Sequence, residues 1–296
     1  MRVFVTGASG FIGLAVTREL LDAGHQVLGL TRSDQGVKAL KEVGAEVFRG
    51  DVENPKDLRD GATRSDAVIH TAFNHDFSKF VANCESDRKV IETLGDALVG
   101  TDKLLMISSG VALAKVAPGA VGTENDPALS SKQFARAASE EAANAIADKG
   151  VRVAIVRLSQ IHDTEKQGLV TFAIEVAREK GVSVYIDDGK NSWSAAPRLD
   201  TARLYRLALE KTGKRATYHA VAEEGVTMRE IAEVIGRGLK VPVVSMTPEK
   251  AAEHFGWLGH FAGLDIRSSS AQTRQQLGWN PTGPGLITDL ENMRYA

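Results

Sequence analysis

Three glycines at three-residue spacing, Gly7, Gly10 and Gly13, follow a short apolar run at residues 3–5 and precede a helical pattern that begins at Phe11. In a strand–turn–helix, such glycines permit a tight turn, a close approach of backbone to a pyrophosphate, and close packing of helix on strand. The N–H groups at the helix N-terminus then bind phosphate. The spacing therefore predicts a dinucleotide site, with a purely structural glycine turn as the alternative. The residues predicted to form it are Gly7, Ser9, Gly10, Phe11, Ile12 and Gly13.

The residue that follows the second strand indicates which nicotinamide cofactor is bound. An acid there would bind a ribose 2′-hydroxyl, whereas an arginine accommodates a 2′-phosphate. This chain has no acid at the end of residues 27–30 and has Arg32 shortly after. We therefore expect NADP, with NAD as the alternative and a solvated loop cation as the other interpretation of Arg32. Asp51 and Val52 follow the third strand, where they would flank the adenine or form a turn that leads into a helix.

Composition excludes several function classes. The 296 residues are 43% hydrophobic and 25% charged with a net charge of −2, which is typical of a globular domain and disfavours nucleic acid or anionic membrane as the main partner. Cys84 is the only cysteine, so we expect neither an intrachain disulfide nor a thiolate metal site. With no long apolar run and a strand that begins at residue 2, we expect a cytoplasmic protein without a signal peptide, a membrane span or a bound metal.

The elements that must position these residues alternate between strands and helices. Apolar runs at the expected strands are separated by helical patterns, which include long helices at 76–99 and 131–148. This alternation predicts an α/β fold with a doubly wound parallel Rossmann sheet. We expect a NAD(P)-binding domain over residues 1–160. The expected strands are residues 3–5, 27–30, 46–48, 67–70, 104–107 and 151–156.

Beyond residue 160 the pattern is less regular. We expect a smaller α+β substrate-binding region over residues 161–296, interleaved with the Rossmann core and able to add a strand to its sheet. Residues 187–197 are predicted to be a polar loop, after which Asp200 caps a helix through Leu209. The other expected elements are helices at 168–180 and 227–239 and strands at 183–186, 218–221 and 243–245.

Several motifs together resemble the extended short-chain dehydrogenase/reductase superfamily, which includes NAD(P)-dependent epimerases, dehydratases and reductases. The resemblance covers residues 1–160 and continues more loosely through the Asp200 helix. It implies that Thr71 and Ala72 also contact the cofactor. The motifs are Thr6–Gly13, Gly50–Val52, His70–Ala72, Ser108–Ser109 after a strand, and Arg157 at the end of the sixth strand.

The sequence departs from the family at the active site. Members use a serine and a Tyr-x-x-x-Lys pair, but no tyrosine precedes Tyr185. Counting back from the sixth strand places the pair on Lys132 and Arg136, as in atypical members with a basic pair. The resemblance implies that Ser109 hydrogen-bonds the substrate oxygen and that Arg136 contacts the ribose of the cofactor. Lys132 could exchange a proton only with a strongly lowered pKa; the alternative is that both cations are solvated on a helix face.

Other side chains could bind substrate at the same edge of the sheet. His75 and His162 follow strands and titrate near neutral pH, although such histidines more often have structural roles. Trp193 and Arg198 lie in the C-terminal region, whose bulky residues suit an apolar pocket, a satellite core or an oligomer contact.

Together these residues predict an NAD(P)-dependent oxidoreductase or epimerase/dehydratase-like enzyme acting on a small hydroxy or carbonyl compound. A sugar nucleotide is less favoured because no dense group of Arg and Asn marks a second diphosphate site. The alternative is a catalytically degenerate NADP-binding sensor. The long helices at 76–99 and 131–148 would permit a homodimer.

Overall fold

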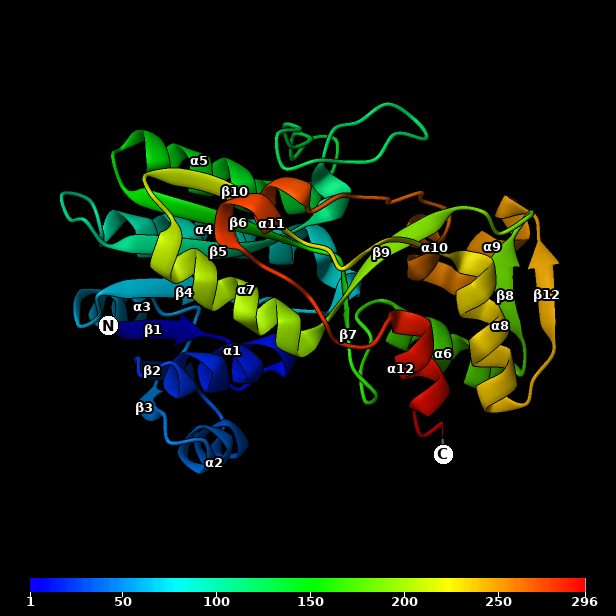
Figure 1. Ribbon diagram of the computed structural model, residues 1–296, viewed down its shortest axis with the longest axis horizontal. Coiled ribbons are helices and arrows are strands. Elements are labelled where there is room, and N and C mark those ends of the chain that lie inside the picture. Colours follow the sequence, from blue (N-terminus) through cyan, green and yellow to red (C-terminus); the bar gives the residue numbers. More distant parts are fainter. Residues whose placement is uncertain (296) are drawn as a thin grey trace.

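The computed structural model describes residues 1–295, and its largest element is a seven-stranded parallel sheet (Figure 1). The strand order is β10-β6-β5-β4-β1-β2-β3, with β1 between β4 and β2. The predicted α/β Rossmann fold is therefore confirmed. The strands are β1 (Arg2–Thr6), β2 (Gln26–Thr31), β3 (Glu46–Arg49), β4 (Ala67–His70), β5 (Leu104–Gly110), β6 (Arg152–Leu158) and β10 (Arg215–Ala220).

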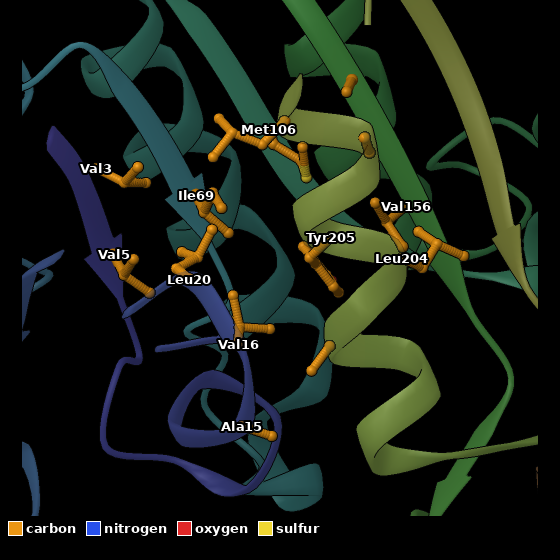
Figure 2. Packing of buried hydrophobic residues seen from close by; sticks show 14 of the residues in the cluster. Val3, Val5, Ala15, Val16, Leu20, Ile69, Met106, Val156, Leu204 and Tyr205 are labelled. Carbon is orange, nitrogen blue, oxygen red and sulfur yellow. The ribbon is translucent and has the colours of Figure 1, made fainter. Parts of the chain in front are cut away.

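Helices cover both faces of this sheet, so its central strands β1, β4 and β5 are buried on both sides. Val3 and Val5 point to one face and Phe4 to the other, as the two-residue period of a strand requires. On the first face the strands pack against α1 (Phe11–Asp22) and α7 (Arg198–Lys211), as Figure 2 shows. The second face is covered by α3 (Pro55–Thr63), α4 (Phe80–Asp96) and α5 (Ala138–Asp148), while α2 (Asp34–Glu42) follows β2 and α11 (Ala271–Leu277) packs beside α7 and β10.

The C-terminal part of the chain builds a second hydrophobic core beside the carboxyl ends of the strands (Figure 1). A three-stranded sheet has the order β11-β9-β7, and a two-stranded sheet pairs β12 with β8. The strands are β7 (Gln160–His162), β8 (Ser183–Ile186), β9 (Ser192–Pro197), β11 (Glu223–Thr227) and β12 (Val243–Met246). The helices are α6 (Val170–Lys180), α8 (Met228–Leu239), α9 (Pro248–Phe255), α10 (Gly259–Ala262) and α12 (Leu286–Asn292).

The chain passes between the two hydrophobic cores more than once. After β9 it returns to the first core as α7 and β10, so residues 198–220 cover and extend the Rossmann sheet. Among residues 1–295, no helix combines the length and apolar character that a membrane crossing requires.

Two expectations about helix boundaries are wrong. The helix expected over 131–148 begins at Ala138, after a single 3₁₀ turn at Ala135–Ala137, and Lys132 lies in the preceding turn. The helix expected over 76–99 is α4, which ends at Asp96 and follows a 3₁₀ turn at Phe77–Lys79.

Two expectations about the C-terminal region are also wrong. The predicted loop at 187–197 contains β9, whose six residues are all buried. Asp200 does not cap α7, because that helix already begins at Arg198 and Pro197 occupies the N-cap position. The Asp200 carboxylate instead accepts hydrogen bonds from the backbone N–H groups of Thr282 and Gly283, at 3.0 and 2.7 Å.

Candidate active site

The glycine turn between β1 and α1 has the geometry that a dinucleotide requires. Gly7 has a φ of +68°, and a Cβ at this position would lie 2.7 Å from the backbone N of Ala72. A Cβ on Gly13 would overlap the carbonyl of Gly7, so the helix can approach the turn this closely only without a side chain. No side chain caps α1 and no acid lies in its first turn, which leaves N–H groups available for phosphate. These residues therefore fit the pyrophosphate of a nicotinamide dinucleotide.

A cavity of about 600 Å³ opens from this turn towards the second core. All six predicted glycine-turn residues line it, together with Thr71 and Ala72. Opposite them the wall is strongly aromatic, and no Asp or Glu is among the lining residues that the structure describes. The aromatic lining side chains beyond the turn are Phe73, Phe77, Phe80, Phe134, Phe172, Trp193 and Phe261.

The guanidinium of Arg136 lies at the junction between the glycine turn and the aromatic wall. Its Nη1 donates to Asp87 Oδ2 at 2.7 Å and its Nη2 donates to the Ser108 carbonyl at 3.0 Å. The same guanidinium lies over the Phe73 ring, 4.3 Å from its centroid. These contacts fix a cation, with a side chain only 15% exposed, in the cavity wall.

Asp87, on the buried face of α4, connects Arg136 to the first strand. Burial raises the pKa of the Asp87 carboxyl, but the charges of Arg136 and His70 and hydrogen bonds from His70 and Ser139 outweigh it, and the pKa lies well below its usual range. His70 Nε2 lies 2.8 Å from Asp87 Oδ1, and His70 Nδ1 lies 2.6 Å from Thr6 Oγ1. A buried chain of polar contacts thus runs from the cavity wall to the residue before Gly7.

Sequence reasoning missed Asp87. The available signal was its position, because Cys84, Asp87 and Ile91 recur at the spacing of one helix face and all three are buried. A carboxylate on an otherwise apolar face requires a cationic or hydrogen-bonding partner. The partner that the structure supplies is Arg136, 49 residues later in the chain.

Ser109 and Lys132, predicted to act with Arg136, lie elsewhere. The Ser109 hydroxyl donates to Glu140 Oε1 at 2.7 Å, and that carboxylate also pairs with Arg157 at 2.9 Å in a buried cluster. Ser109 does not line the cavity; the next residue, Gly110, does. Lys132 is exposed in its turn and also lies outside the lining, because the 3₁₀ turn at 135–137 separates it from the helix that would have aligned it with Arg136.

Two of the four predicted substrate contacts line the cavity. His75 lies at its partly exposed rim, where surrounding protein lowers the pKa of the imidazole, with smaller contributions from Lys166 and Arg136. Trp193 is 1% exposed, and its Nε1 donates to the Leu264 carbonyl at 3.2 Å.

His162 and Arg198, the other two predicted contacts, are not among the lining residues. His162 is fully buried with Nδ1 2.6 Å from Asp289 Oδ2, so it holds α12 against β7. Arg198 pairs with Asp163 at 3.0 Å, and its guanidinium lies over the Phe11 ring, 4.9 Å from the centroid.

Arg32, Asp51 and Val52 lie together beyond β2 and β3, outside the cavity. Arg32 Nη1 is 3.4 Å from Asp51 Oδ2, and the Arg32 side chain is 75% exposed. Val52 packs against the hydrophobic core on the second face of the sheet. The Arg32 guanidinium is thus exposed just after the end of β2.

Comparisons with known proteins agree with this geometry. Residues 7–185 match the family described as NAD(P)H-binding. The chain is 43% identical to an uncharacterised protein of Schizosaccharomyces pombe, over 100% of both chains.

Solved structures share the fold. UDP-glucose 4-epimerase of Thermus thermophilus, in complex with NAD, superposes with a TM-score of 0.75 at 19% identity and covers 100% of this chain and 99% of its own. A double mutant of dTDP-glucose 4,6-dehydratase from Streptomyces venezuelae, with NAD bound, gives 0.78 at 21% identity over 100% and 96%. The chain therefore belongs to the family described as NAD(P)H-binding, and it shares its fold with the NAD-bound epimerase and dehydratase structures.

Proposed function

We propose that the protein is an NADP(H)-dependent oxidoreductase that acts on a small hydroxy or carbonyl compound. The observation that supports this most is the anchored guanidinium of Arg136, held between a pyrophosphate-binding turn and an apolar cavity. A preorganised cation at such a junction stabilises negative charge that develops on a reacting oxygen. The nicotinamide, when bound, supplies or accepts the hydride.

Arg136 retains donors for a substrate. Its guanidinium has five N–H groups, and hydrogen bonds to Asp87, Ser139 and Ser108 use three of them. The N–H of Nε and one N–H of Nη2 have no acceptor among residues 1–295, so they can donate to a carbonyl or alkoxide oxygen. Arg136 does not exchange a proton near neutral pH. His75, the one histidine among the lining residues that the structure describes, is proposed to exchange it with the substrate oxygen directly or through water.

The choice of NADP rests on the end of β2. That strand ends at Thr31 without an acid, and Arg32 follows with an exposed side chain. A guanidinium at this place suits a 2′-phosphate, because phosphate accepts charge-assisted hydrogen bonds from arginine.

A catalytically degenerate NADP-binding sensor is the second candidate. The observation that favours it is the placement of Ser109 and Lys132, since the Ser109 hydroxyl is bound to Glu140 and Lys132 lies outside the cavity lining. A sensor would need the cofactor site and the cavity but no proton exchange.

Consumption of NADPH against a panel of aldehydes, ketones and nucleotide sugars separates the two candidates. We expect consumption with a carbonyl compound, and a loss of about 100-fold in kcat for Arg136→Lys, because lysine keeps the charge but cannot reproduce the fork of donors. Arg88→Lys is the matched control, since Arg88 follows Asp87 on α4 and pairs with Glu141 of α5 at 2.7 Å, outside the cavity. Stable NADPH binding with no consumption, together with NADPH-dependent binding of a partner, would favour the sensor.

A further inference from the structure

A set of aromatic side chains beside the cavity packs ring against ring. Phe77 and Trp257 are stacked, with centroids 4.1 Å apart and an interplanar angle of 6°. Phe172 meets both at nearly right angles, at 5.6 and 5.0 Å. The ring cluster, as used below, consists of Phe77, Phe80, Phe134, Phe172, Trp257 and Phe261.

The ring cluster presents both aromatic faces and aromatic edges to its surroundings. Phe80, Phe134 and Phe261 form a mutual edge-to-face triangle with centroid distances of 6.0 to 6.1 Å. These three rings and Phe77 line the main cavity on one side and a second hollow of about 300 Å³ on the other. Five of the six cluster rings line the main cavity, so a ligand there meets mainly π surface and ring C–H groups.

Two charged side chains line the cavity, Lys166 and Arg136, and neither belongs to the ring cluster. Lys166 lies 5.9 Å from the centroid of Phe11 in the glycine turn. Arg136 forms an ion pair with Asp87. The lining residues that the structure describes include no carboxylate, and the ring cluster itself carries no charge, so the part of the cavity beside the ring cluster suits an uncharged ligand.

We propose that the substrate is an uncharged aromatic carbonyl compound, or the corresponding alcohol, with its ring in the ring cluster and its oxygen towards Arg136. The carbonyl part of this inference rests on the proposed function, whereas the recognition of a ring rests on the ring cluster itself. Reduction would transfer a hydride from NADPH to the carbonyl carbon. The electrons of the C–O π bond pass to the oxygen, which accepts hydrogen bonds from Arg136 and then a proton, so that the ketone becomes an alcohol and NADPH becomes NADP⁺.

Acetophenone and cyclohexyl methyl ketone test the inference, because they share a carbon skeleton and a carbonyl group and differ in the aromaticity of the ring. Binding to the NADP⁺-loaded protein, where no reduction can occur, is measured by calorimetry and by the quenching of tryptophan fluorescence. Aromatic pairs are favoured beyond their buried area, so we expect acetophenone to bind about fivefold more tightly. UDP-glucose is expected to bind more weakly than either ketone.

Substitutions in the ring cluster should remove the preference. In Phe77→Leu and Phe80→Leu the ratio of the two dissociation constants should approach one, and this ratio does not depend on the fraction of protein that is folded. Phe48→Leu is the control, since Phe48 packs edge-to-face on Phe4 at 5.9 Å, away from the cavity, and the ratio should persist.

Equal dissociation constants for the two ketones in the unmodified protein, or tighter binding of UDP-glucose, would overturn the inference. A ring preference without NADPH consumption would support the inference about the ring and overturn the oxidoreductase function. NADPH consumption with saturated ketones and no ring preference would support the oxidoreductase function and overturn the inference about the ring.

Discussion

The ion pair between Arg136 and Asp87 is the residue-scale feature on which the proposed chemistry depends. Both side chains are largely removed from water, at 15% and 4% exposure, and the desolvation of two such charges offsets much of their attraction. The ion pair therefore fixes the position of the Arg136 guanidinium more than it adds to the net stability of the fold. Asp87 orients the guanidinium, and His70 and Thr6 orient Asp87 from the strand that leads into the glycine turn.

Replacement of Asp87 should lower stability in a pH-dependent way. Asp87→Asn leaves the Arg136 charge without its counter-ion, and we expect a loss of about 3 kcal/mol in the free energy of unfolding at pH 7. The folded-state pKa of Asp87 is lowered, so its stabilisation is full above the unfolded pKa of about 3.9 and decreases as the pH falls below it. The difference between the unmodified protein and the variant should therefore shrink between about pH 5 and pH 3.

Urea unfolding at several pH values measures this difference. Asp148→Asn is the control, because Asp148 is 73% exposed in its pair with Arg215 and its replacement should change stability little at any of these pH values. A difference for Asp87→Asn that stays constant as the pH falls would show that the carboxylate is not stabilised by Arg136.

At the scale of elements, the glycine turn and the alternating strands could be predicted from the sequence because their signals are local. The start of α5 could not. The side chain of Gln133 accepts hydrogen bonds from the N–H and the hydroxyl of Ser130, and the Gln133 N–H donates to the Ser130 carbonyl. This turn competes with the helix in which Lys132 and Arg136 would share a face.

The strand β9 was missed for a different reason. Its sequence, Ser192–Pro197, alternates polar and apolar residues over only four positions, and even its two serines are buried between β11 and β7. Its partners on β7 lie 35 residues earlier in the chain, so no local pattern indicates the pairing. Asp200 was misassigned as a cap because the backbone N–H groups that it binds are more than 80 residues away.

The packing of α1 on the glycine turn gives a prediction at this scale. Gly13→Ala places a Cβ against the backbone of Gly7, which cannot move aside as a flexible side chain would. We expect NADPH binding to weaken at least about tenfold, because the helix N-terminus that receives the pyrophosphate is displaced. Gly110→Ala is the matched control in the same cavity wall, since its Cβ would meet only the Leu158 carbonyl, at 4.0 Å. Similar NADPH affinities for the two variants, measured by fluorescence titration, would contradict this account of the turn.

On the scale of the whole molecule, the cavity lies between two hydrophobic cores. The glycine turn and Arg136 come from the Rossmann side, whereas Phe172, Trp193 and Phe261 come from the second core. A ligand that fills the cavity therefore contacts both cores. Its binding free energy adds to the stability of the state in which the cores are docked, because the undocked state lacks half of the site.

Thermal unfolding with added cofactor should report both this coupling and the choice of cofactor. At 100 times its dissociation constant NADPH adds about 2.7 kcal/mol, which corresponds to a rise of about 5 °C in Tm. Trp279 lies in the first core and Trp193 in the second, so tryptophan fluorescence follows the unfolding of both cores.

NADH at the same concentration should give a smaller rise in Tm. In Arg32→Ala the NADPH rise should fall to that of NADH, which itself stays unchanged, because only the 2′-phosphate distinguishes the two. Arg64→Ala, at an exposed ion pair with Glu46, should keep the full NADPH rise. Equal rises for both cofactors in the unmodified protein would refute the assignment of NADP, whereas a rise confined to one of two separate unfolding transitions would refute the coupling of the cores.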